Sequence, residues 1–303
     1  MTIAITGASG FIGRNLVAHL TARGDEVVPV RRPFERRALS DLFGRVSAVV
    51  HLAGLVSAVH DDDFVTANVD ATRMVASAAR DAAVRLVHIS SLAAAGPAPS
   101  SSPRSEADPP HPITAYGRSK LAGERVLQEI DGLQWLALRP GIVYGPGDRA
   151  MLPLFRMARR GVLPLVGRAG AAYTVIQVGD AVRAIAAAID AQVTGDAMFV
   201  GHPSPATPRA IIDGIRAAVA PHARVVTVPM ALTRVAAVCG EVAQRVRRRP
   251  TLINASRFRE LDAEGFVCRV DRLRERLGVV AEIGLTEGLA QTGEWYRRNG
   301  WLS

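Results

Sequence analysis

Cysteine, lysine and aromatic residues are all scarce in this sequence of 303 residues. The two cysteines, Cys239 and Cys268, are too few for a disulfide framework and are not spaced like metal ligands. No stretch reaches about 18 uncharged apolar residues, which argues against a membrane span. The chain opens on a strand-like run rather than a basic segment followed by an apolar one, so we expect no secretory signal. These absences favour a reducing, cytoplasmic setting and no metal site.

Basic residues are numerous, but their distribution does not favour nucleic-acid binding. The net charge is +9, from 37 Lys+Arg against 28 Asp+Glu. The arginines are spread along the chain and cluster only at Arg31–Arg37 and Arg245–Arg249. No series of aromatic residues alternates with them to stack on bases. We therefore expect no nucleic-acid partner, while a weak attraction to anionic surfaces stays open.

Only one of the 37 basic residues is a lysine, Lys120, and the other 36 are arginines. Lysine is a compact point charge with three rotatable donors, whereas arginine is a planar fork that stays protonated. A single surviving lysine indicates a position where a guanidinium cannot substitute, with chance survival as the alternative.

Short β-branched runs alternate with helical patterns along the first two thirds of the chain. Such alternation predicts an α/β fold with a doubly wound, mostly parallel Rossmann sheet and a smaller C-terminal substrate lobe. We expect a dinucleotide-binding domain over 1–145, to which 174–195 returns, and a substrate-binding lobe over 146–303. The expected strands are 2–6, 26–30, 48–52, 85–89, 135–139 and 175–178, and the expected helices are 12–23, 66–82 and 115–130.

Two segments outside this alternation have their own interpretation. Residues 97–112 are rich in proline and serine without periodicity, which predicts a long loop that could act as a lid. Residues 230–246 form an amphipathic pattern interrupted by Arg234 and Glu241. We interpret it as a helix of the lobe rather than a membrane anchor.

Three glycines join the first strand to the first helix. Gly7 permits a tight turn, Gly10 lets the backbone approach a pyrophosphate at the helix N-terminus, and Gly13 allows close helix–strand packing. This pattern predicts a dinucleotide site. The residues expected to contact the dinucleotide here are Gly7, Ser9, Gly10, Phe11, Ile12 and Gly13.

The end of the second strand indicates which dinucleotide is bound. An acidic residue there would hold the 2′-hydroxyl of NAD, but the strand runs into Arg31 and Arg32. Two guanidinium groups suit a 2′-phosphate through charge-assisted bonds. We therefore expect NADP(H) in preference to NAD(H), with a solvated basic loop as the alternative.

Tyr116 and Lys120 are four residues apart, which on a helix places them on one face. A neighbouring ammonium lowers the pKa of a phenol, so that it can exchange a proton near neutral pH. Ser90 and Ser91 follow the strand at 85–89, and the carboxyl ends of parallel strands border the ligand crevice. A serine hydroxyl there can donate to a substrate carbonyl, although a helix cap is an equal alternative.

The combination of these motifs resembles the extended short-chain dehydrogenase/reductases. Further similar segments are His51–Gly54, Asn68–Thr72, Arg139–Gly147, Leu285–Leu289 and Trp295–Tyr296. The resemblance implies that Ser91 orients a carbonyl, Tyr116 is the acid/base and Lys120 assists it. It also implies frequent homodimers, through a four-helix bundle that includes the Tyr-Lys helix. Besides Tyr116 and Lys120, it adds these cofactor contacts: Leu52, Ala53, Gly54, Asn68, Ile89, Pro140 and Val143.

The residues next to these motifs favour ketone reduction over the dehydration and epimerisation reactions of the same family. Ser91 is followed by Leu92-Ala93, not by the Asp-Glu pair of the family's dehydratases. Ala94-Ala95-Gly96 replaces the Val-Tyr-Gly of the sugar-nucleotide epimerases and is closer to hydroxysteroid dehydrogenases and flavonoid ketone reductases. Gln177 stands where those epimerases usually carry a histidine, and their arginine is missing, unless Arg248 or Arg249 replaces it.

We therefore expect an NADP(H)-dependent oxidoreductase that reduces a ketone, or oxidises the matching alcohol, of a largely apolar small molecule. The alternatives are a nucleotide-sugar epimerase with tightly bound NAD, and a non-enzymatic dinucleotide sensor or scaffold. The residues expected on the substrate side are Ser91, Leu92, Ala93 and Tyr144. The histidines without metal partners at ligand spacing are His51, His60, His88 and His111.

Overall fold

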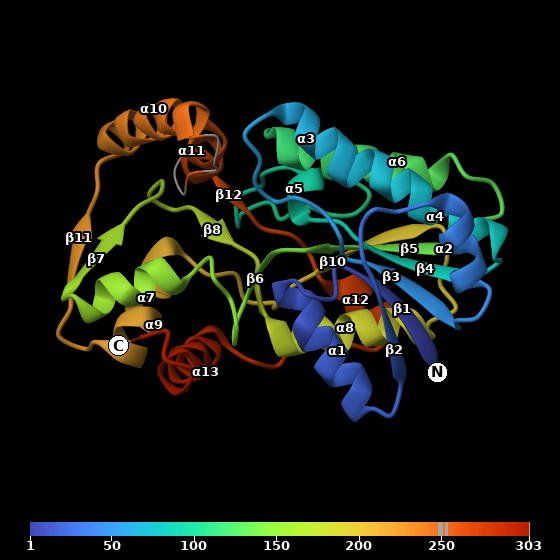
Figure 1. Cartoon of the computed structure of the whole chain (residues 1–303). Helices are drawn as coiled ribbons and strands as arrows, with labels where there is room; N and C mark the ends of the chain where they lie inside the picture. The colour runs from blue at the N-terminus through green and yellow to red at the C-terminus, as the bar shows by residue number, and fades with distance from the viewer. Residues whose placement is uncertain (248–250, 252–253, 303) are drawn as a thin grey trace.

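Six parallel strands form the central sheet, in the order β10-β5-β4-β3-β1-β2 (Figure 1). The computed structural model describes residues 1–247, 251 and 254–302. The strands of this sheet are β1 (Thr2–Thr6), β2 (Glu26–Val30), β3 (Ala48–His51), β4 (Arg85–Ile89), β5 (Trp135–Pro140) and β10 (Asp196–Val200).

Alternate residues of the strands enter two separate cores, one on each face of the sheet. Ile3 and Ile5 pack on one side, whereas Ala4 between them packs on the other. This follows from the two-residue period of a strand when both faces are covered, which is why the strands are apolar throughout.

Helices cover both faces of the sheet. One face carries α1 (Phe11–Ala22) and α8 (Val178–Asp190), and α12 (Asp271–Leu277) packs against α8 and β10. The other face carries the mutually packed helices α2 (Arg36–Phe43), α4 (Ala71–Asp81) and α6 (Ala115–Gln128), as Figure 1 shows. The helix expected at 66–82 is preceded by α3 (Asp61–Val65) and begins with a π-helical turn, η1 (Thr66–Asp70).

One strand expected in the central sheet lies elsewhere. β9 (Val175–Gln177) pairs with β6 (Ile142–Tyr144) in a two-stranded sheet, and β10 takes the sixth position of the central one. The segment that returns to the dinucleotide-binding domain, expected as 174–195, therefore continues through residue 200. Helix α12 also packs on this domain, although it belongs to the range 146–303 expected for the substrate-binding lobe. β10 was not expected from the sequence, because it opens with Asp196 and Ala197, residue types that are depleted in strands.

The second lobe has its own apolar core, which includes Tyr144, Phe155, Leu289 and Tyr296. Tyr296 stacks on Trp301 with ring centroids 5.7 Å apart and donates its hydroxyl to the Asp148 carbonyl oxygen at 2.5 Å. The elements of the lobe are α7 (Leu152–Arg159), β7 (Val162–Leu165), β8 (Ala172–Tyr173), α9 (Pro208–Val219), β11 (Arg224–Thr227), α10 (Met230–Arg247), α11 (Ala255–Asp262), β12 (Gly265–Phe266) and α13 (Leu285–Arg298).

The loop over 97–112, expected as a lid, is anchored along its length. Arg104 forms a parallel bridge with Cys268 and donates to the carbonyl oxygens of Pro97 and Pro109 at 3.1 Å each. Glu106 accepts a hydrogen bond from the Phe199 amide at 3.0 Å. These bonds fix the loop to the second lobe and to the end of β10. A short α-helix, α5 (Leu92–Ala95), precedes it.

Two features are absent from the described part of the chain. None of its helices is long and apolar enough to cross a bilayer. Nor do three or more His, Cys, Asp or Glu side chains gather there in a way that could hold a metal ion.

Candidate active site

The glycine loop between β1 and α1 has the shape of a phosphate cradle. Gly7 has a φ of +74°, which other residues rarely adopt. A Cβ on Gly13 would lie 2.2 Å from the Gly7 carbonyl oxygen, so only glycine allows this approach of helix and loop. A Cβ on Gly10 would meet only that same oxygen, at 3.2 Å, and no side chain caps α1. The free amides of the helix N-terminus therefore fit a pyrophosphate.

Ser91, Tyr116 and Lys120 lie together at the carboxyl end of β4. Tyr116 and Lys120 come from the first turns of α6, which Thr114 caps by accepting from the Gly117 amide at 3.1 Å. Ser91 caps α5, and its side chain is near enough to Tyr116 to lower the pKa of that phenol. Lys120 donates to the Ile89 carbonyl oxygen at 2.6 Å. The pair predicted from spacing and the serine predicted from strand position are thus neighbours.

Charge at this site differs from the expectation that Lys120 acidifies Tyr116. Burial raises the pKa of Tyr116 above its ordinary value, and the hydrogen bond with Ser91 lowers it. The charged groups that act on the Tyr116 pKa are Glu260 and Arg257 of α11. Burial lowers the pKa of Lys120 to about 8, and the charge of Glu124 opposes this. Lys120 is held toward the strand end rather than against the phenol.

A buried ion pair joins α6 to β5 and was not predicted from the sequence. Glu124, one turn beyond Lys120, accepts hydrogen bonds from the Arg139 guanidinium, with Nη2–Oε2 at 2.5 Å, and from the Ser90 hydroxyl. Glu124 is 2% exposed and Arg139 9% exposed. The available signal was an arginine inside an apolar strand, because a buried charge requires a partner.

The segment after β3 is positioned by Asn68. This side chain accepts from the Leu55 amide at 2.8 Å and donates to the Leu55 carbonyl oxygen and to Ser119 Oγ, both at 2.9 Å. A Cβ on Gly54 would lie 2.7 Å from Asn68 Oδ1 and 3.8 Å from Lys120 Nζ. Asn68, expected at the cofactor, is 1% exposed and acts here by holding Leu52–Leu55 beside the catalytic lysine.

Several residues expected at the cofactor line one small apolar pocket. The pocket lies where the ends of β4 and β5 meet α1 and β6, and its walls are Ile12, Ile89, Leu138, Pro140, Val143, Ala181, Ile185 and Val200. Two residues expected on the substrate side are instead packed in cores. Tyr144 is 1% exposed against Gly288, and Leu92 is 3% exposed beside Phe199 and Cys268. In this structure neither side chain faces an open site, and the substrate roles expected for them stay predictions.

The two arginines after β2 have different surroundings. Arg31 is exposed. Arg32 donates to the Ala67 carbonyl oxygen at 3.0 Å, and its guanidinium lies 5.7 Å from the centre of the Phe34 ring. Arg31 is therefore the freer of the two to meet a ligand.

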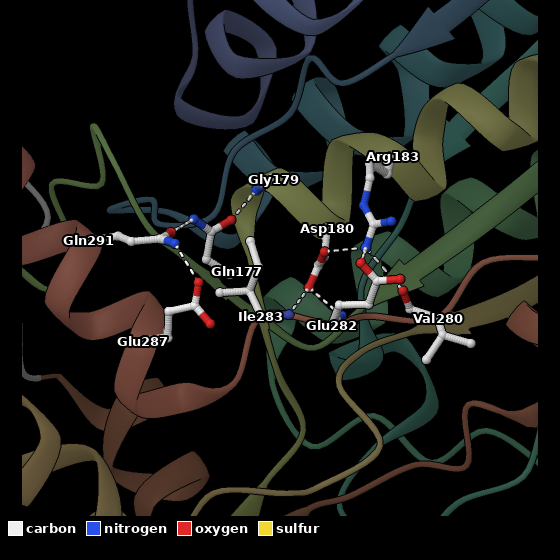
Figure 2. Close-up of polar contacts among 9 residues, drawn as sticks. All are labelled: Gln177, Gly179, Asp180, Arg183, Val280, Glu282, Ile283, Glu287 and Gln291. Atoms are coloured by element: carbon white, nitrogen blue, oxygen red, sulfur yellow. Dashed lines mark hydrogen bonds and ion pairs between the residues drawn. The ribbon is translucent and has the colours of Figure 1, made fainter.

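The turn into α8 fastens the second lobe to the sheet layer (Figure 2). Gln177 caps α8 by accepting from the Gly179 amide and donates to Gln291 Oε1 of α13 at 2.8 Å. Asp180 accepts from the amides of Glu282 and Ile283 at 2.9 and 2.8 Å. Gln177 thus attaches the second lobe to the sheet layer. Arg248 and Arg249, considered as a replacement arginine, lie outside the described residues.

His51 at the end of β3 and His88 in β4 are buried side by side, with ring centroids 5.4 Å apart. His51 shares hydrogen bonds with Thr6 Oγ1 at 2.7 Å and Thr72 Oγ1 at 3.1 Å. Burial lowers the pKa of His51 to about 3, and burial likewise holds the pKa of His88 well below its usual value. Both rings are neutral core groups.

Comparison with known proteins agrees with this geometry. Residues 3–201 match the model of the NAD dependent epimerase/dehydratase family. The chain belongs to this family. It is 30% identical to the ceramide reductase of Caulobacter vibrioides over 99% of this chain and 96% of that protein. It is 27% identical to the 2-alkyl-3-oxoalkanoate reductase of Stenotrophomonas maltophilia over 95% of this chain and 97% of that protein.

A solved structure shows the same architecture. MoeE5 in complex with UDP-glucuronic acid and NAD superposes with a TM-score of 0.78 at 27% identity, covering 99% of this chain and all of that one. This family member therefore has a Rossmann-like fold and is an enzyme of the extended short-chain dehydrogenase/reductase type, acting on a CH–OH or C=O group with a nicotinamide cofactor.

Proposed function

We propose that this enzyme is an NADP(H)-dependent reductase of a ketone on a largely apolar small molecule, or the dehydrogenase of the matching alcohol. The observation that carries the proposal is the grouping at the carboxyl end of β4, where the Ser91 side chain acts on the pKa of the Tyr116 phenol and the Lys120 ammonium, one turn along α6, bonds the Ile89 carbonyl oxygen. The similarity to two reductases, one named for ceramide and one for 2-alkyl-3-oxoalkanoates, supports an apolar substrate.

Ser91, Tyr116 and Lys120 have different roles in the proposed reduction of the substrate carbonyl. A bound reduced nicotinamide supplies the hydride. Ser91 donates a hydrogen bond to the carbonyl oxygen, and Tyr116 donates its proton to that oxygen as negative charge develops there. The Tyr116 phenol stays protonated until it is used, because burial raises its pKa. Lys120 keeps a positive charge near the site and meets the Ile89 carbonyl oxygen.

The test of this assignment is Tyr116→Phe, assayed by NADPH oxidation over long-chain and cyclic ketones. We expect kcat to fall at least about a hundredfold, because proton transfer is lost while the ring is kept. Tyr296→Phe is the matched control, since its hydroxyl bonds Asp148 in the second lobe. It should lower stability and leave kcat intact. Full turnover in Tyr116→Phe would refute the role of the phenol.

The cofactor preference is tested by Arg31→Ala and Arg32→Ala. We expect the KM for NADPH to rise about tenfold or more in Arg31→Ala, because NADPH carries the 2′-phosphate that this guanidinium would bind. The KM for NADH, which has no 2′-phosphate, should stay unchanged. Arg45→Ala, another exposed arginine, serves as the control. Equal effects on both cofactors would contradict the NADP(H) preference.

A nucleotide-sugar epimerase is the second candidate, supported by the similarity to MoeE5. An epimerase retains its cofactor through the cycle, so purified protein should release NAD on denaturation and bind a UDP-sugar. Release of little cofactor, together with NADPH consumption on ketones, would favour the reductase.

A further inference from the structure

The outward face of α10 is apolar. Five of its large side chains are more than half exposed: Leu232 at 60%, Val235 at 60%, Val238 at 60%, Val242 at 57% and Val246 at 78%. The side of this helix turned to the protein is polar or small instead, with Thr233, Ala237 and Gln244 at 2–3% exposure. A surface helix normally has the opposite arrangement.

The period of the helix gathers these side chains into one stripe. At about 3.6 residues per turn, Val235, Val242 and Val246 lie opposite Ala237, and Leu232 and Val238 fall on either side of them. Cys239 is exposed within the same stripe. Figure 1 shows α10 on the rim of the second lobe, at the upper left.

Specific polar bonds hold the helix in this orientation. Gln244 donates to the Ala58 carbonyl oxygen at 3.2 Å and accepts from Asn254 Nδ2 at 3.2 Å. Thr251 donates its hydroxyl to the Gly240 carbonyl oxygen at 3.2 Å. Rotating α10 to bury its valines would break these hydrogen bonds. The bonds therefore keep the apolar stripe facing outward.

The charges beside the stripe favour an anionic occupant. Arg234 and Arg247 are exposed and lie at its two borders, and the sequence continues with Arg248 and Arg249. The acid of this helix, Glu241, is half-buried on the inner side. A second copy docked through this stripe would bring arginines against arginines, which costs free energy.

The shape of the stripe favours a lipid surface over a protein. It is a convex ridge of aliphatic side chains without the aromatic anchors that dominate protein interfaces. The headgroup boundary of a bilayer accepts such a ridge, with the arginines reaching lipid phosphates.

We propose that α10 lies flat on membranes that contain anionic lipids, with Leu232, Val235, Val238, Val242 and Val246 at the headgroup–acyl boundary. The neighbouring helix α11 packs against α10 and carries Arg257 and Glu260, whose charges reach Tyr116. One helix layer thus separates the membrane face from the catalytic site. If the proposed apolar substrate is correct, it would enter from the surface on which the enzyme sits.

The test is cosedimentation of the full chain with phosphatidylcholine vesicles, with and without one third phosphatidylglycerol. We expect binding that needs the anionic lipid and weakens with salt, and a partition coefficient at least about tenfold lower for Val235→Asp/Val242→Asp. Arg234→Gln/Arg247→Gln should weaken binding to the anionic vesicles alone. Val226→Asp places the same residue type at an exposed valine of β11 and should bind like the wild type, and Val235→Asp alone is its single-substitution counterpart on the stripe.

A second readout follows the stripe directly. Cys239 is exposed and Cys268 is 7% exposed, so a polarity-sensitive thiol dye labels the stripe selectively. Its emission should shift to the blue with anionic vesicles. Equal binding of Val235→Asp/Val242→Asp and wild type would overturn the proposal. So would a wild type that binds no vesicle but loses a dimer on the same substitutions, which would assign the stripe to a second copy. Neither measurement needs turnover, so the proposed function is tested separately.

Discussion

Two opposing influences set the charge on Lys120. Burial lowers the pKa of its ammonium to about 8, and the Glu124 carboxylate raises it. Glu124 is in turn fixed by Arg139 and Ser90, which come from the ends of the two strands that flank the site. The glutamate therefore acts on the reaction through the lysine, as a positioning residue.

Glu124→Gln should shift the pH profile of ketone reduction. Without the carboxylate, the Lys120 pKa falls further below about 8, so the charged lysine is lost at lower pH. We expect the basic limb of kcat/KM against pH to move to lower pH. Leaving Arg139 buried and unpaired should also cost about 3–5 kcal/mol of stability.

Glu129→Gln provides the control at the C-cap of the same helix, since Glu129 pairs with Arg73 in solvent and is 58% exposed. Its profile and stability should match the wild type. A Glu124→Gln enzyme that is less stable but keeps the wild-type pH profile would reduce Glu124 to a structural role.

The residues proposed to react could be brought together from the sequence because their positions follow from spacing along the chain. Tyr116 and Lys120 are one helical turn apart, and Ser91 follows a strand, so local periodicity places all three. Glu124 and Arg139 were missed because their pairing joins a helix to a later strand. Tyr144 packs in the core of the second lobe, a long-range contact that no local pattern reports.

At the scale of elements, the site depends on the close approach of α6 and α5. A Cβ on Gly117 would lie 2.4 Å from the Ala93 carbonyl oxygen, although Gly117 has an ordinary helical backbone. Gly117 directly follows Tyr116, and Ala93 lies two residues from Ser91. The contact therefore sets the distance between the two hydroxyl groups of the site.

Gly117→Ala should separate Ser91 from Tyr116. We expect kcat to fall about tenfold or more with a smaller change in the KM for NADPH, because a displacement of 1 Å in a catalytic group is costly. Gly44→Ala is the control, since its Cβ would meet the Ser40 carbonyl oxygen at an ordinary 3.6 Å. An unchanged kcat in a folded Gly117→Ala enzyme would show that the helices can separate without harm.

The elements that the pattern predicted are those with several residues of clear period. The first five strands of the central sheet and α1, α4 and α6 belong to this group. β10 was missed because it opens with Asp196 and Ala197, residue types that are depleted in strands. β9 was assigned to the wrong sheet because a local pattern does not specify which strand it pairs with. The anchoring of 97–112 depends on Arg104 and Glu106, whose partners lie far along the chain.

At the scale of the whole molecule, two neutral histidines in the core make the fold sensitive to acid. The unfolded chain binds a proton at His51 below about pH 6.5, whereas the folded protein does so only near pH 3. The free energy of unfolding must therefore fall as the pH drops through this window. His88 adds to the effect in the same direction, since its pKa is also lowered by burial.

We expect the free energy of unfolding to drop by about 2 kcal/mol from His51 alone between pH 6 and pH 4, on top of the contributions of carboxylates. Denaturant titrations across that range measure it. His88→Leu should flatten the slope, because it removes a buried imidazole whose two nitrogens lack hydrogen-bond partners among the described residues. His222→Leu, at an exposed position, should keep the wild-type slope. If His88→Leu and the wild type lost stability in parallel, the buried histidine would not be the cause of the acid sensitivity.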